Sequence, residues 1–130
     1  MTYFPDLSPY TYLPTSGNAG RSPVNVGWLD RGHGFARGPV PQPFMDALLE
    51  HLDMPCNRTR GYHLCNLCDA REPVRVKFHD SEAMLGDAEI HASVPGRLYV
   101  APNLVIHYVA EHDYRPPDLF IAAVLGTERT

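Results

Sequence analysis

Proline and glycine limit the length of every regular element that this chain can form. The sequence contains 13 prolines and 10 glycines among 130 residues, more than an average domain of this size. Both residue types interrupt helices and strands and favour turns. The sequence therefore predicts short elements joined by many loops, and it argues against a helical bundle.

The overall composition is typical of a globular domain. Hydrophobic residues make up 44% of the chain and charged residues 20%, and the length is about that of one domain. We therefore expect residues 1–130 to form a single domain with a modest core. The formal net charge is −4 and the basic residues are scattered, so there is no strong signal for nucleic-acid binding.

The first ten residues, MTYFPDLSPY, lack the basic and apolar regions of a signal peptide. No apolar run is long enough to span a bilayer. We therefore expect a cytoplasmic protein with no membrane partner. Closely spaced cysteines in that reducing compartment more often bind metal or do chemistry than form disulfides. Three cysteines also suit a disulfide framework poorly, because the number is odd.

Three segments carry helical signals. Pro43 suits the first turn of a helix over 41–54, and a second helix is expected at about 103–112. Segment 118–126 is very apolar and ends at Gly126. The first helix has one apolar stripe, formed by Phe44, Leu48, Leu49 and Leu52.

Three segments, 74–79, 88–94 and 97–101, read as strands, the first two because apolar and polar residues alternate along them. They predict a small antiparallel sheet with one solvated face, which would carry Glu89 and His91. The predicted core comprises Val74, Val76, Phe78, Ile90, Leu98 and Val100 against Leu104, Ile106, Phe120 and Leu125. Residues 1–40 are rich in aromatic side chains and predict an ordered but irregular segment that wraps the core.

Cys65 and Cys68 form a CxxC motif within the stretch GYHLCNLC. Two thiolates on one tight turn suit zinc, because backbone N–H groups in such a turn donate hydrogen bonds to sulfur. The alternatives are a pair of small buried apolar side chains and a dithiol redox pair. A redox pair usually opens a helix within a βαβ unit, whereas this motif follows a polar turn.

A four-coordinate zinc site needs two more ligands, and the sequence offers four candidates. His63 is adjacent to the motif, and Cys56 lies nine residues before Cys65. His107 and His112 have the His-x4-His spacing of zinc fingers. On a regular helix these two histidines would diverge by about 140°, so the last turn would have to be distorted. The candidate metal ligands are Cys65, Cys68, His107, His63, His112 and Cys56.

The chain resembles a family of small uncharacterised bacterial proteins over nearly its whole length. The stretches that carry the resemblance are YFPDLSPY, VGWLDRGHGF, RGYHLCNLC, AEIHASVPG and APNLVIHYVAEHDYRPP. The resemblance implies a fold that stands alone and transfers no activity. It draws attention to Trp28, Asp30, His33, His63, Cys65, Cys68, His107 and His112, whereas Cys56 lies outside these stretches.

These observations predict an α+β fold. A small antiparallel sheet would be packed by about three short helices, with an irregular aromatic-rich N-terminal segment and a CxxC zinc knuckle. The favoured function is a zinc-stabilised module that binds an unknown protein partner or small molecule, or that regulates. An alternative is a small zinc enzyme with an open coordination position, whose general base would be Glu89, Glu111 or His33. An immunity-type or antitoxin-type binding protein is a further alternative.

Overall fold

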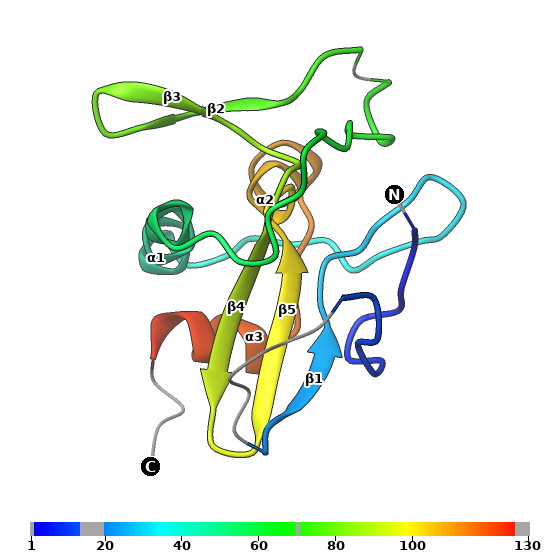
Figure 1. Cartoon of the computed structure of the whole chain (residues 1–130), viewed down its shortest axis with the longest axis vertical. Helices are drawn as coiled ribbons and strands as arrows, with labels where there is room; N and C mark the ends of the chain where they lie inside the picture. Colours follow the sequence, from blue (N-terminus) through cyan, green and yellow to red (C-terminus); the bar gives the residue numbers. More distant parts are fainter. Residues whose placement is uncertain (1, 14–19, 70, 127–130) are drawn as a thin grey trace.

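The computed structural model describes residues 2–13, 20–69 and 71–126 (Figure 1). In chain order its elements are β1 (Ser22–Asn25), α1 (Gln42–Glu50), the 3₁₀-helix η1 (His51–Asp53), β2 (Arg75–Phe78), β3 (Ser81–Met84), β4 (Glu89–Val94), β5 (Arg97–Pro102), α2 (Val105–His112) and α3 (Asp118–Leu125). The predicted α+β class with three short α-helices is confirmed. In the described ranges, no helix is long and apolar enough to cross a membrane.

The central sheet has three strands in the order β1-β5-β4 and is mixed. β4 and β5 pair antiparallel, with Val94 opposite Arg97, and Gly96 occupies the tight turn between them with a φ of 79°. β1 runs parallel to β5, with Ser22 opposite Arg97. The structure thus corrects the prediction of a purely antiparallel sheet, because a parallel pair needs a long connection and leaves no local turn signal.

Residues 75–78 form the first strand of a separate hairpin, and they are not part of the central sheet. β2 pairs antiparallel with β3, with Phe78 opposite Ser81. His79 adopts a φ of 56° in the turn between them, a conformation that tight hairpin turns require. The prediction that 74–79 belongs to the same sheet as 88–94 and 97–101 is therefore wrong, because β2 pairs with the residues that immediately follow it. Figure 1 shows this hairpin extending away from the central sheet.

One face of the central sheet packs against α1 and α3. The Phe120 ring of α3 lies 6.1 Å, centroid to centroid, from both Phe44 of α1 and Tyr99 of β5, in edge-to-face arrangements. Leu48, one α1 turn beyond Phe44, is fully buried. Of the predicted core residues, Ile90, Leu104, Ile106 and Phe120 are buried in this cluster, and Val74, Val76 and Leu125 pack partly buried against it.

The other face of the sheet is covered by the N-terminal segment. Leu98 and Val100 are buried there with Tyr10 and Trp28. The indole N–H of Trp28 donates to the carbonyl of Val100 over 3.0 Å. The predicted aromatic wrap is therefore present. It also corrects the side assigned to Leu98 and Val100, because alternate strand residues face opposite ways and these two point away from Tyr99 and the helices.

The same wrap buries Glu89 and partly buries His91, both of which we expected on a solvated face. The Glu89 side chain is 4% exposed. Its carboxylate accepts hydrogen bonds from the Tyr10 hydroxyl and from Asn57 Nδ2, the latter over 2.7 Å, and lies 2.9 Å from His91 Nε2. Burial and the neighbouring carboxylate raise the pKa of the Tyr10 phenol. Glu89 thus holds the N-terminal segment, a loop and the sheet together.

Candidate metal centre

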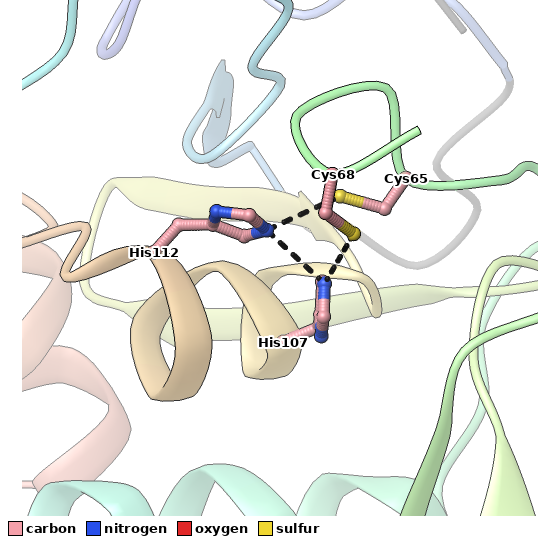
Figure 2. A group of neighbouring side chains, drawn as sticks. All are labelled: Cys65, Cys68, His107 and His112. Carbon is pink, nitrogen blue, oxygen red and sulfur yellow. Dashed lines mark hydrogen bonds between the residues drawn. The ribbon is translucent and has the colours of Figure 1, made fainter. Parts of the chain in front are cut away.

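Four side chains of metal-ligand type converge from two segments (Figure 2). Cys65 and Cys68 come from the loop between η1 and β2, and His107 and His112 come from α2. The Cys65 sulfur lies 3.5 Å from His112 Nε2, and the Cys68 sulfur lies 3.5 Å from His107 Nε2. The two Nε2 atoms are 3.2 Å apart, and all four ligand atoms lie within 4.8 Å of one another.

These distances match the edges of a zinc tetrahedron. With Zn–S bonds of about 2.3 Å and Zn–N bonds of about 2.05 Å, a regular tetrahedron has S–N edges of roughly 3.5 Å and an N–N edge of roughly 3.3 Å. The observed separations are 3.5, 3.5 and 3.2 Å. The four side chains are therefore arranged as a Cys2His2 group that could hold a metal ion.

The turn at Cys65–Cys68 directs backbone N–H groups at the sulfur of Cys65, which favours metal binding. Cys65 is buried and Cys68 is exposed. Burial raises the pKa of the Cys65 thiol, while hydrogen bonds from the backbone N–H groups of Leu67 and Cys68 to its sulfur act in the opposite direction. Such N–H···S bonds stabilise a thiolate. Burial penalises this thiolate when it is alone, and a bound cation would remove the penalty.

The two histidines meet because α2 ends in a widened turn. The carbonyl of Tyr108 accepts hydrogen bonds from the N–H groups of Asp113 and Tyr114, which are five and six residues further on. A regular α-turn closes over four residues. Asp113 takes a left-handed φ of 58°, a conformation that aspartate tolerates better than most residues. The wider turn allows His112 to come back toward His107.

The surroundings favour neutral imidazole at His107. Burial and the neighbouring His112 lower the pKa of His107, and Glu111 acts in the opposite direction. Neutral imidazole is the form that binds a metal. Tyr108 lies buried beside the group, and burial together with the thiolates of Cys65 and Cys68 raises the pKa of its phenol.

The structure places His63 and Cys56 elsewhere on the same loop. The backbone N–H of His63 donates to the carbonyl of Gly86 over 2.8 Å. Cys56 forms an isolated β-bridge with Glu89, and its thiol donates to the carbonyl of Met54 over 3.6 Å. His63 thus fastens the loop to the connection between β3 and β4, and Cys56 fastens it to the first residue of β4. In the part of the chain that is described, neither joins the ligand group.

The three candidate general bases are not members of the ligand group. His33 Nδ1 lies 2.7 Å from Asp30 Oδ1, and the Tyr3 ring stacks on the imidazole at 3.8 Å. Glu111 is exposed, and Glu89 is enclosed by its own partners. Among the described residues, none of the three candidate bases hydrogen-bonds to a cysteine or histidine of the group.

A second group, Glu50, Asp53 and His79, also has ligand atoms within 4.8 Å of one another. Sequence reasoning missed it because only the tertiary fold brings His79, in the β2–β3 turn, close to the end of α1 and η1. All three side chains are exposed, so the group lacks the burial and the sulfur donors of the Cys2His2 group.

A family model described as a domain of unknown function, DUF7919, matches residues 2–125. The chain belongs to the DUF7919 family. The match includes all four side chains of the Cys2His2 group and both segments that carry them, and it confirms the predicted resemblance to an uncharacterised family. No curated protein and no solved structure matches the chain. The function of this DUF7919 domain therefore has to be argued from its own residues.

Proposed function

We propose that this DUF7919 domain is a zinc-stabilised module that binds a protein partner or has a regulatory role. The observation that carries the proposal is the spacing of the four ligand atoms, whose closest separations are 3.2 to 3.5 Å. Two thiolates and two imidazoles favour zinc over magnesium or calcium, which prefer oxygen ligands. A cytoplasmic location, which keeps the thiols reduced, is part of the proposal.

A bound zinc ion would fasten an irregular segment to the helical core. Between η1 and β2, the described residues of 54–74 form neither a helix nor a strand. Backbone hydrogen bonds attach this segment at Cys56, Thr59 and His63, and the Cys2His2 group would attach its far side to α2. In small domains a metal adds folding free energy that a modest core cannot supply.

The number of protein ligands favours this role over catalysis. Structural zinc sites are closed by four protein ligands, whereas catalytic sites keep a position for water. The four side chains of the group would fill a tetrahedral shell. A small zinc enzyme would need one of them to leave the metal, and an immunity-type or antitoxin-type binder has only the small size and acidic charge in its favour.

Native mass spectrometry tests the metal, and X-ray absorption at the zinc edge tests its ligands. We expect one zinc ion per chain, lost on treatment with a chelator, and a shell of two sulfur and two nitrogen atoms. Cys65→Ser should lose the ion, and Cys56→Ser is the matched control that should keep it. A chain purified without metal that takes up no zinc would refute the proposal, and a shell with one oxygen from water would support the enzyme instead.

A further inference from the structure

A cleft of about 330 Å³ lies between η1, the β2–β3 hairpin and the start of β4. None of the four side chains of the Cys2His2 group lines it. In Figure 1 the hairpin extends above α1, and β4 begins below the hairpin. The cleft is therefore a separate feature of the domain.

The floor of the cleft contains a carboxylate with weak partners. Asp87 is 8% exposed. In the described chain, its side chain contacts Asn103 Nδ2 at 3.4 Å and Arg58 Nε at 3.7 Å. Both separations exceed those of a charge-assisted hydrogen bond, about 2.7–2.9 Å. Arg58 is itself 64% exposed. A buried carboxylate is stabilised by a close cationic or hydrogen-bonding partner, and Asp87 has none at short range.

The neighbouring Glu89 shows what a satisfied carboxylate looks like in the same cleft. It has close contacts with the Tyr10 hydroxyl, with Asn57 Nδ2 at 2.7 Å and with His91 Nε2 at 2.9 Å. The contrast between the two residues indicates that Asp87, rather than Glu89, is the group left for a ligand.

The charges that line the cleft favour a cation. They comprise the carboxylates of Asp53, Glu82, Asp87 and Glu89 against the guanidinium groups of Arg58 and Arg75. His51 also lines the cleft, and burial and the neighbouring His91 lower its pKa, which favours the uncharged ring. The buried charges are the acidic ones, and charges act more strongly in buried surroundings than at the exposed rim.

The walls suit the aliphatic part of a long basic side chain. Leu52, Phe78 and Met84 offer apolar surface, and Tyr62 adds an exposed aromatic ring. Lysine and arginine bury their methylene stems against such surface while the charged end finds a polar partner. Aromatic rings also attract these cations.

We propose that this cleft receives a lysine or arginine side chain of a partner polypeptide, with its cation paired to Asp87 in place of Arg58. The identity of the partner as a polypeptide rests on the proposed function as an interaction module. The recognition of an alkyl cation rests on the cleft alone. The cleft would then supply an anchor point for the partner, and the hairpin would form one wall of the interface.

Titration of the zinc-loaded protein with small blocked amino acids, followed by NMR, tests the proposal. N-acetyl-arginine amide and N-acetyl-lysine amide should shift the signals of Asp87, Tyr62 and Phe78. N-acetyl-citrulline amide, which has the shape of arginine without its charge, should bind about tenfold more weakly or not at all. Equal binding of arginine and citrulline, or tighter binding of N-acetyl-aspartate amide, would overturn the proposal.

Two substitutions act in opposite directions on this binding. Asp87→Asn should lower the affinity for N-acetyl-arginine amide by about tenfold. Arg58→Ala should raise that affinity, because the substitution removes the competing cation. Glu72→Gln, at an exposed carboxylate outside the cleft, is the matched control and should change the affinity less than about twofold. Unchanged affinity in Asp87→Asn, or weaker binding in Arg58→Ala, would refute the assignment. Zinc content, measured in each variant, separates failure of the cleft from failure of the metal centre.

Discussion

The Nε2 atoms of His107 and His112 lie 3.2 Å apart, although five positions on a helix separate the two residues. A regular helix would turn them about 140° away from each other. The widened turn at Tyr108 makes the approach possible. A shared metal ion would stabilise this approach of the two ring nitrogens.

Replacing His107 by glutamine should separate a metal ligand from an ordinary core histidine. We expect His107→Gln to lower zinc affinity by about 100-fold or more, and to reduce thermal stability only when zinc is present. Competition with a zinc-binding dye measures the affinity. His63→Gln, in the same loop as the cysteines but outside the group, should leave it unchanged. An equal loss of stability with and without zinc would mean that His107 acts by packing alone.

Truncation of Ile90 probes the helix-covered face of the central sheet. Ile90 is 1% exposed in the main core, and Ile90→Ala should lower the free energy of unfolding by about 2–5 kcal/mol. Urea denaturation of the zinc-loaded protein measures the change. Ser93→Ala, at an exposed position of the same strand, should cost less than about 0.5 kcal/mol. A loss that small at Ile90 would contradict the packing of this face.

Gly86 should tolerate no side chain. Its φ is 111°, and an added Cβ would lie 2.3 Å from the carbonyl oxygen of His63. The backbone of the loop would have to move, so Gly86→Ala should destabilise the domain by on the order of 3 kcal/mol or more. Gly34→Ala is the matched control, because an added Cβ there meets nothing within 4 Å. Equal denaturation midpoints for the two variants would contradict this prediction.

Mild acid should destabilise the domain through His51. Burial and the neighbouring His91 hold the pKa of His51 below its ordinary value of about 6.5. Between the lowered pKa and about 6.5 the unfolded state binds more protons than the folded state, so stability rises with pH in this window. We expect the free energy of unfolding to fall as the pH drops below about 6.5.

The comparison of wild type with His51→Gln isolates this residue from the protonation of the metal ligands. Urea denaturation at several pH values between about 5 and 7.5 should show a shallower pH dependence in His51→Gln. Parallel curves for the two proteins would assign the whole acid effect to other groups.

Local patterns were sufficient to predict the three α-helices and, among the described residues, two of the three strands of the central sheet, β4 and β5. The apolar stripe of α1 and the stop of α3 at Gly126 both depend on neighbouring residues, and each lies where the sequence places it. The CxxC turn and the two histidines of α2 were also visible, because metal ligands have characteristic spacings.

The errors concern contacts between distant residues. The parallel pairing of β1 with β5 joins Ser22 to Arg97, and it leaves no alternation or turn that a sequence pattern could show. The burial of Glu89 depends on Tyr10, 79 residues earlier in the chain. His63 and Cys56 were candidate ligands because they lie close to the CxxC motif in the sequence. Their backbone hydrogen bonds to Gly86 and Glu89 hold them outside the group formed by the two other cysteines and the two histidines of α2.

The parallel pair of β1 and β5 also sets the order of events during synthesis. Ser22 cannot meet Arg97 until the ribosome has added 75 further residues, which takes roughly 4 to 15 seconds at 5–20 residues per second. Throughout that interval Trp28 and Tyr10 lack Leu98 and Val100, the sheet residues that bury them in the finished fold. A nascent chain of this domain would therefore hold its aromatic segment without these burial partners until Leu98 and Val100 have been synthesised, which makes that segment a natural target for chaperones that bind apolar stretches.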